Sequence, residues 1–302
     1  MNNKRRLFST LLCVAALTAG LFVSGCGSDK ADSIGSVVSS VVDGGSDEKA
    51  AAKLNTLIDA TNRFNGDNAT WGQNYADSLA KLKGGFQEGA IGRQPHYDTL
   101  KDALEKSKKE GSTFKEVDTE RDNVLNILNE LVPTFKDLKA YDDSKAYMND
   151  GGAKGKELAA KYVAQVEKFD AAYAKFNDAL NKANTEQTKK QIEKLKKDGK
   201  KGYAAAMEST LRLTTLVENV EKAPKNADKQ AVEKELNEIQ TLLKSINNDR
   251  GEVLVNSYNS VVGSVRQVLT DANENNLNDM IENFNNYIES YNNTTPDQFD
   301  SK

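Results

Sequence analysis

Residues 158–180 read LAAKYVAQVEKFDAAYAKFNDAL and carry the clearest apolar stripe in the chain. Its members follow one another at intervals of four, four, three, four, three and four: Leu158, Tyr162, Val166, Phe169, Tyr173, Phe176 and Leu180. This spacing places them on one face of an α-helix, as in the seam of a coiled coil. The four aromatic residues could instead line a box for a sugar or a peptide, but at this spacing aromatic side chains are typical of a helical core.

The same helical period continues on both sides of this stripe, from about residue 48 to residue 293. The expected helices are marked by Leu54, Ile58 and Phe64; Trp71, Tyr75, Leu79, Leu82 and Phe86; Tyr97, Leu100 and Leu104; Val117, Val124, Leu128, Leu131, Phe135 and Leu138; Tyr203, Met207, Leu211, Thr214 and Val217; Val232, Leu236, Ile239, Leu243 and Ile246; Leu254, Tyr258, Val261, Val265 and Val268; and Leu277, Ile281, Phe284, Ile288 and Tyr291. Residues 254–268 are rich in β-branched side chains but lack the alternation of a strand, which favours helix. Pro133 predicts a kink or a break in its helix. The sequence therefore predicts an all-α fold.

The predicted seams are separated by loops, so no single seam runs through the whole chain. This favours helices folded back on themselves over one long oligomeric coiled coil. We expect an elongated antiparallel helical bundle, built either as one bundle or as two stacked sub-bundles. The glycine-rich stretch 84–92 and the polar loop 149–155 are the candidate boundaries between two halves.

The N-terminus has the pattern of a bacterial lipoprotein signal. Basic residues 4–6 precede an uncharged run over 7–23, and Val23-Ser24-Gly25-Cys26 matches a lipobox. We expect residues 1–25 to be a signal peptide and Cys26 to be acylated, with chains such as palmitate that anchor it stably in a membrane. An uncleaved transmembrane anchor is the alternative, but the uncharged run is shorter than the roughly 20 residues that a span needs.

The lipobox also predicts the location and the order of the segments. Gly27 follows Cys26, where the inner-membrane retention signal of enterobacteria has aspartate, so the outer membrane or the cell surface is favoured. Residues 26–47 are rich in Gly, Ser and Asp and are expected to form a flexible tether. Residues 48–293 are the predicted helical domain, and residues 294–302 a disordered tail.

Composition excludes several classes of protein. Cys13 lies in the predicted signal peptide and Cys26 is the predicted lipidation site, so the mature chain has no pair of cysteines for a disulfide and no cysteine metal site. Loss of the signal changes the formal net charge from −4 to −7, which is not the charge of a nucleic-acid binder. The fold must therefore depend on core packing, for which the chain is long enough.

Residues suited to catalysis are scarce. His96 is the only histidine, which excludes zinc sites and proton relays that need two. A Ser-His-Asp triad through His96 lacks the β/α setting of such triads. Gly84 and Gly89 have the separation found in a phosphate loop, but Ala90 stands where its lysine belongs. We expect no catalytic residue, no cofactor and no metal site.

Two polar clusters have a plain interpretation beside a functional one. Asp142, Asp143, Asn149 and Asp150 could bind calcium weakly, but the order of EF-hand ligands is absent, which favours a solvated loop. A basic patch could meet anionic headgroups or envelope polymers; it comprises Lys189, Lys190, Lys194, Lys196, Lys197, Lys200 and Lys201. Glu186 and Glu193 stand three or four residues from these lysines, which favours a solvated helix face.

Residues 141–158 read YDDSKAYMNDGGAKGKEL and lead directly into the aromatic helix. Together with the lipobox and Lys53-Leu54-Asn55, this tyrosine-bearing loop with its Gly-Lys-rich helix entry resembles the YiiG-like family of bacterial lipoproteins, whose domain is the domain of unknown function 3829. The resemblance covers roughly residues 50–293. It implies an all-helical envelope domain and transfers no catalytic residue to this chain.

Three functions remain open. The first is a non-enzymatic interaction or scaffold module with an envelope protein partner, for which the amide-rich helix 273–293 is a candidate contact. The second is a small-ligand protein with a pocket lined by Tyr162, Tyr173, Trp71 or Tyr203, although the seams are mostly apolar. The third is a carboxylate-based cell-wall hydrolase, whose paired acids cannot be told from surface carboxylates by sequence. The lack of a readable catalytic motif favours the first.

Overall fold

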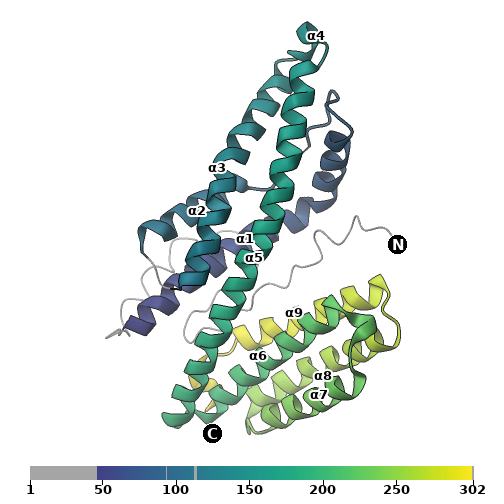
Figure 1. Ribbon diagram of the computed structural model, residues 1–302. Coiled ribbons are helices and arrows are strands. Elements are labelled where there is room, and N and C mark those ends of the chain that lie inside the picture. Colours follow the sequence, from purple (N-terminus) through teal and green to yellow (C-terminus); the bar gives the residue numbers. More distant parts are fainter. Residues whose placement is uncertain (1–45, 93, 112–113, 301–302) are drawn as a thin grey trace. The chain divides into compact units, whose positions relative to one another are not determined.

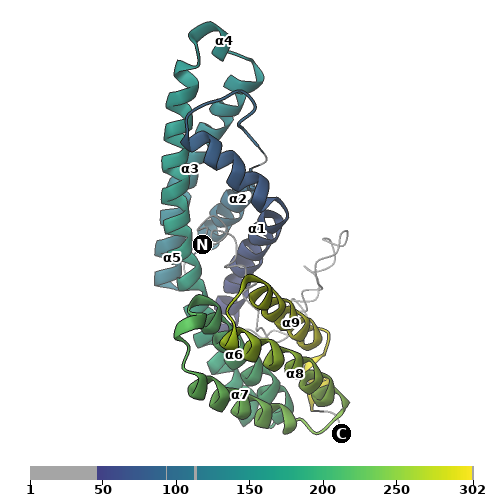
Figure 2. The ribbon, with the colours of Figure 1, turned by 90° about the vertical axis from the view of Figure 1, so that its right-hand side faces the viewer.

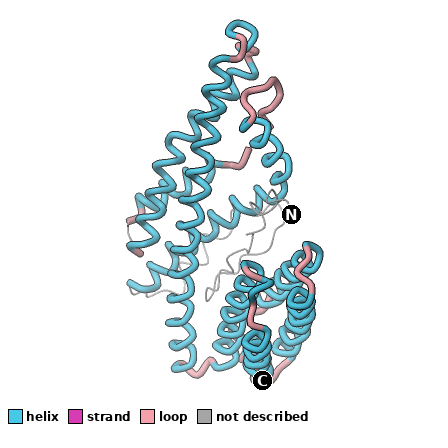
Figure 3. Tube along the Cα trace, turned by 45° about the vertical axis from the view of Figure 1, so that its right-hand side comes forward, coloured by secondary structure: helices cyan, strands magenta, loops and turns pink. Residues whose placement is uncertain are grey.

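The computed structural model describes residues 46–92, 94–111 and 114–300, and the regular elements in these ranges are helices (Figure 3). In chain order they are α1 Ser46–Lys83, α2 Tyr97–Lys109, α3 Lys115–Asp143, α4 Tyr147–Asp150, α5 Ala153–Lys197, α6 Lys201–Lys222, the 3-10 helix η2 Pro224–Asn226, α7 Lys229–Lys244, α8 Asp249–Thr270, α9 Glu274–Asn292 and α10 Pro296–Phe299 (Figure 1). The prediction of an all-α fold is confirmed.

The predicted signal peptide, the lipidation site Cys26 and most of the predicted tether lie outside the described residues. Residues 46 and 47, assigned to the tether by composition, instead begin α1. The side chain of Trp71 is also outside the described set. Within that set, no helix combines the length and the hydropathy that a membrane crossing requires.

The described chain divides into two compact units, residues 46–183 (unit 1) and 184–300 (unit 2). The division falls inside α5, so the boundaries predicted at 84–92 and 149–155 are wrong. The first of these loops joins α1 to α2, and the second joins α3 and α4 to α5. Because α1 packs on α2, and α3 on α5 through Phe135 and Tyr162, both loops turn the chain within unit 1.

Helix α1 is continuous, whereas the apolar pattern suggested separate helices over 54–64 and 71–86. Gly66 lies between the two stripes, and its side is open to solvent. A glycine inside a helix costs about 1 kcal/mol relative to alanine. Burial of apolar side chains on both sides of Gly66, Leu54 and Leu82 among them, outweighs that cost.

Helix α3 also continues through Pro133, which excludes a break there; the alternative, a kink, stays a prediction. Pro133 is exposed, and a proline on the solvent side leaves to water the carbonyl that loses its backbone donor. The Thr134 hydroxyl donates a 2.9 Å hydrogen bond to the carbonyl of Glu130 in the turn before it. The helix therefore tolerates the proline without ending.

The core of unit 1 is built on the apolar stripe of residues 158–180. Helices α3 and α5 lie side by side in opposite directions, with α4 at the turn between them (Figures 1 and 2). Phe169 of α5 meets Phe64 of α1 at 5.9 Å and Tyr97 of α2 at 5.0 Å between ring centroids. The side chains of Tyr162, Val166, Phe169, Phe176 and Leu180 are buried. The interpretation of the stripe as core is confirmed.

Unit 2 packs helices α6, α7, α8 and α9 around a mainly aliphatic core, with α8 and α9 in the most extensive contact (Figure 2). Its buried side chains include Leu213, Val217, Leu243, Leu254, Val261 and Val265. The buried Tyr287 of α9 bonds its hydroxyl to that of Thr210 on α6 at 3.0 Å. Residues 254–268 are helical, as their spacing predicted.

The buried stripe of α9 is rotated from the predicted one. Met280, Phe284, Tyr287 and Tyr291 are buried, whereas Leu277, Ile281 and Ile288 are only half-buried. The two stripes share Phe284 and Tyr291, so the pattern alone does not separate them. The stripe that adds Tyr287 is buried because it has the larger aromatic area and a hydroxyl with a partner inside the core.

The C-terminal segment is ordered to Asp300, so the prediction of a disordered tail over 294–302 is wrong for 294–300. Thr295 and Gln298 form a capping box at the start of α10. Phe299 is 2% exposed and stacks on Tyr203 and Tyr291. One aromatic side chain and a cap outweigh the polar composition from which disorder was predicted.

Candidate interaction surface

The aromatic residues of α5 form part of the core and do not line an open box. Tyr162 donates its hydroxyl hydrogen to the side-chain carbonyl of Gln94, and the hydroxyls of Tyr75 and Tyr97 share a hydrogen bond of 2.8 Å. Tyr173 donates to Asn65 at 3.0 Å. Burial raises the pKa of Tyr97 and Tyr162 well above that of a free phenol, so these groups stay neutral. Neutral, hydrogen-bonded phenols are what a core tolerates.

The other residues of the predicted ligand pocket do not join the aromatic residues of α5. Tyr203 belongs to unit 2, where it stacks on Phe299. Trp71 lies outside the described side chains. His96 is exposed and precedes α2, and its carbonyl accepts the backbone bond of Leu100. The glycines of 84–92 form the turn that was expected, with Gly85 and Gly89 at positive φ.

The acidic residues near the end of α3 have protein partners. Asp143 forms an ion pair with Lys139 at 2.9 Å. Asp150 accepts hydrogen bonds from the Tyr141 hydroxyl, from the amide of Gly152 at 2.9 Å and from the amide of Lys154 at 3.1 Å. Among the described residues no group of three or more acidic, histidine or cysteine side chains is placed to hold a metal ion. The interpretation as a polar loop is the one these contacts favour.

The lysine-rich stretch at the end of α5 also finds acidic partners. Lys196 lies 2.9 Å from Glu208 of α6 and 3.5 Å from Glu193, and Lys200 lies 3.3 Å from Asp297. Glu193 was a predicted partner, whereas Glu208 and Asp297 are distant in sequence and were missed. Lys189, Lys190 and Lys197 are exposed. These contacts favour a solvated helix face.

Residues 144–152, which we call the hairpin tip, carry the most exposed large apolar side chain of the described chain. Met148 is 73% exposed, beside the half-buried Ala146 and Tyr147. The tip joins α3 to α5 through the short helix α4 (Figures 1 and 2). Methionine adapts its shape to different partners, and it is common at protein-binding surfaces.

The backbone of the hairpin tip is fixed by local hydrogen bonds. The amide of Ala146 bonds the carbonyl of Tyr141 at 3.1 Å, and the amide of Lys145 bonds that of Asp142 at 2.9 Å. This is a Schellman motif, with Lys145 at φ 54°, where glycine is usual. On the far side Asp150 caps the start of α5, and its bond from Tyr141 lowers the pKa of Asp150. The tip therefore fixes the backbone that carries Met148.

The loop over residues 84–92, which follows α1, packs against the hairpin tip. The ring of Phe86 meets Tyr141 edge-on at 5.2 Å and lies 5.8 Å from Tyr147. A hydrogen bond to Glu88 raises the pKa of Tyr147 to about 12. A Cβ at Gly155 would come within 2.6 Å of both Phe86 and Tyr141, so this close packing requires glycine. The tip and the glycine-rich loop are one packed structure.

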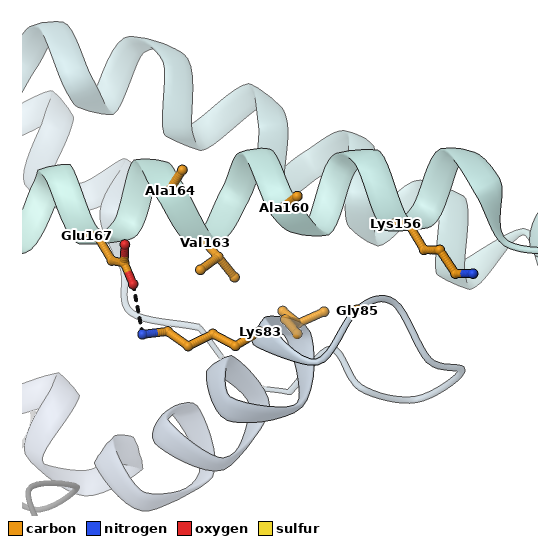
Figure 4. A pocket seen from close by; sticks show the side chains of 8 residues that line it. Lys83, Gly85, Lys156, Ala160, Val163, Ala164 and Glu167 are labelled. Carbon is orange, nitrogen blue, oxygen red and sulfur yellow. Dashed lines mark ion pairs between the residues drawn. The ribbon is translucent and has the colours of Figure 1, made fainter.

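A groove of about 280 Å³ lies between the end of α1 and the first half of α5 (Figure 4). Its floor is made of small side chains, with Ala160, Val163 and Ala164 on α5 facing Gly85. Lys83 and Glu167 form a 2.8 Å ion pair that joins the two walls. Burial, opposed by Lys83, raises the pKa of Asp170 on the next turn of α5 to about 6. The volume is just below the roughly 300–1,000 Å³ of typical ligand pockets.

Comparison with known proteins identifies the family. The model of a family described as "protein of unknown function (DUF3829)" matches residues 48–293. The chain belongs to this family. No curated protein and no solved structure matches it. The domain predicted by the resemblance is confirmed, while the finer likeness to YiiG-like lipoproteins stays a prediction.

The DUF3829 match contains the hairpin tip and the groove and ends just before the ordered C-terminal segment. Sequence reasoning missed the tip as a surface, although its residues carried the resemblance. A usable signal was present: Met148 breaks the polar composition of the loop between two predicted helices. The groove had no such signal, because small residues that line a groove look the same in sequence as those that fill a helix contact.

Proposed function

We propose that this member of the DUF3829 family is a lipid-anchored envelope protein that binds a protein partner through its hairpin tip. The observation that carries the proposal is Met148, 73% exposed on a backbone that hydrogen bonds hold at both ends. A preorganised backbone loses little conformational entropy on binding, so even a small apolar surface on it can contribute to affinity.

The anchor rests on the lipobox that ends at Cys26. Acylation at this position would hold the helical domain at the outer membrane or at the cell surface, where soluble partners diffuse past a fixed tip. A non-enzymatic role is supported by the state of the aromatic seam. Tyr162 and Phe169, which could have lined a substrate site, are buried among other rings.

A first experiment tests the anchor. The full chain and the Cys26→Ala variant are expressed in a bacterial host, labelled with a radioactive fatty acid and separated into soluble and membrane fractions. We expect label and membrane association for the unchanged chain and neither for the variant. A Cys26→Ala chain that stays in the membrane fraction would contradict the lipoprotein assignment.

A second experiment tests the tip. The tagged, acylated chain is solubilised in mild detergent, and co-purifying proteins are compared for Met148→Asp and Val253→Asp. Val253, 41% exposed on α8, is the matched control because it is also an exposed large apolar side chain. We expect Met148→Asp to lose a stoichiometric partner that Val253→Asp retains. Loss only after changes at the exposed Asn285 and Asn286 would move the interface to α9.

The groove supports a second candidate function, the binding of a small ligand. The observation that supports this candidate is the volume of the groove, about 280 Å³, beside the Lys83–Glu167 ion pair. The discriminating variant is Ala164→Leu, which fills the groove from α5 and leaves the tip unchanged. If the groove is functional, this variant abolishes a ligand-induced rise in melting temperature that Met148→Asp preserves.

A further inference from the structure

The C-terminal segment of unit 2 is held by side chains and backbone from three helices, which we call the tail-binding surface. The ring of Phe299 stacks on Tyr203 of α6 at 5.8 Å, with 12° between ring planes, and on Tyr291 of α9 at 6.0 Å and 26°. The Asn248 side chain at the start of α8 donates to the carbonyls of Gln298 and Phe299, each at 3.1 Å.

Asp300, the residue after Phe299, is bound by backbone amides at the N-terminus of α6. The carboxylate of Asp300 accepts from the amide of Gly202 at 2.6 Å and from that of Tyr203 at 3.3 Å. These amides open α6, a helix of 22 residues, where the helix dipole favours a negative charge. Two independent features, an aromatic pair and an anion-binding helix end, thus select two neighbouring residues of one segment.

Gly202 is required for this contact. A Cβ at this position would lie 2.1 Å from the carbonyl oxygen of Phe299 and 3.0 Å from the Asp300 carboxylate. The backbone of α6 itself does not demand glycine, because Gly202 lies within a regular helix and no positive φ is recorded there. The glycine therefore serves the bound segment.

The family match includes the residues of the tail-binding surface but not the two residues bound to it. Gly202, Tyr203, Asn248 and Tyr291 all lie inside residues 48–293, whereas Phe299 and Asp300 lie beyond them. The occupant is also short: Asp297 is 89% exposed in its side chain, and only Phe299 is deeply buried in α10. A short segment with one deeply buried ring detaches at a lower free energy than the helices that it covers.

We propose that the tail-binding surface recognises a peptide segment in which phenylalanine precedes an acidic residue, and that the chain's own residues 294–300 occupy it until such a partner segment competes. Asn248 donates to two backbone carbonyls of the segment, a kind of contact that any residue type offers. Specificity comes from the ring between two tyrosines and from the carboxylate at the start of α6. The proposal concerns unit 2 and does not depend on the hairpin tip.

The test uses the full chain with Phe299→Ala, which removes the buried ring and so weakens the hold on the chain's own segment, and a fluorescent peptide of residues 294–300, TTPDQFD. We expect saturable binding to Phe299→Ala and much weaker binding to the unchanged chain. Alanine at the phenylalanine of the peptide should weaken binding at least about tenfold, because a buried aromatic ring is lost. Asparagine at its final position should weaken binding about two- to fivefold, through the helix dipole.

Two controls keep the test decisive. Adding Gly202→Ala to Phe299→Ala should abolish peptide binding without loss of helix signal, because the new Cβ fills the place of the Phe299 carbonyl. In the unchanged chain, a short competitor ending in Gln-Phe-Asp should speed hydrogen exchange over residues 294–300. If a folded Phe299→Ala chain binds no peptide, or the competitor leaves exchange unchanged, the proposal is overturned.

Discussion

The two units reach a buried core by different chemistry. In unit 1, rings from α1, α2, α3 and α5 contact one another, and tyrosine hydroxyls are paired inside the core, as in Tyr75 with Tyr97. In unit 2, Val and Leu dominate the interior around the buried Tyr258, Phe284 and Tyr287, and the ring-to-ring contacts of the described residues gather around Phe299. Aromatic rings therefore contact one another throughout the core of unit 1, whereas in unit 2 they do so around one short segment.

This difference teaches that an aromatic pattern alone does not identify a site. The stripe over 158–180 has the strongest aromatic signal in the sequence and is core. Phe299, isolated in a polar segment, packs on Tyr203, which is far away in sequence, and on Tyr291 of the helix just before it. Phe169 in the core also has partners far away in sequence, Phe64 and Tyr97, so the contacts in the structure are needed to separate the two cases.

The largest expected effect tests whether the units are separate cooperative bodies. Phe169→Ala should destabilise unit 1 by about 3–5 kcal/mol, because a buried ring with three aromatic neighbours leaves a cavity. In hydrogen exchange, protection should fall first over 46–183. Phe284→Ala, the matched change in α9, should act first over 184–300. Equal loss in both units from either change would merge them into one body.

A glycine pair tests the packing beneath the hairpin tip. Gly155→Ala should destabilise the protein by about 1–3 kcal/mol, because its Cβ would overlap Phe86 and Tyr141. Gly263→Ala in α8 is the control, since nothing lies within 4 Å of its Cβ; it should stabilise by about 0.5–1 kcal/mol through helix propensity. Thermal unfolding measures both, and stabilisation by Gly155→Ala would show that the tip is loosely packed.

Each unit has a carboxyl group whose pKa is raised above its ordinary value. Burial raises the pKa of Asp170 from 3.8 to about 6 in unit 1 and the pKa of Glu221 from 4.5 to about 7 in unit 2. The folded state then binds these protons more tightly than the unfolded state. This contribution to stability is complete below the unfolded pKa and is lost as pH rises through the folded pKa.

The contribution of these two groups to the melting temperature should therefore fall as pH rises from about 4 to 7. Asp170→Asn should remove the part of this fall below about pH 6, and Glu221→Gln the part that extends to about pH 7. Calorimetry across this range measures both variants. An unchanged pH profile in either variant would show that its carboxyl group is well solvated.

The smallest expected effect compares two helix ends. Lys145 after α3 and Gly199 after α5 hold the same place in the same Schellman motif, at φ 54° and 80°. Lys145→Gly should stabilise by about 0.5–1 kcal/mol, because glycine adopts this conformation without strain, and Gly199→Ala should destabilise by a similar amount. Denaturant unfolding compares them. A destabilising Lys145→Gly would mean that the lysine side chain itself supports the tip.

Helix periodicity predicted the helical segments of the described chain and most of their buried residues, because burial of one face requires that spacing, but it divided α1 into two helices. It could not place the division within α5, since an uninterrupted helix shows no signal where its neighbours change. It also misread the C-terminus, where Phe299 and the capping pair Thr295 and Gln298 act against polar composition. For the hairpin tip, the sequence showed an apolar methionine in a polar loop but not the hydrogen bonds that fix the loop backbone.

The most direct test of the central claim is photo-crosslinking from position 148 in living cells. A photoreactive amino acid replaces Met148 in the anchored full chain, and in a second chain it replaces Val253. We predict one dominant adduct with an envelope protein from position 148 and none from position 253. Equal capture from both positions, or none from position 148, would contradict the assignment of the hairpin tip as a partner-binding surface.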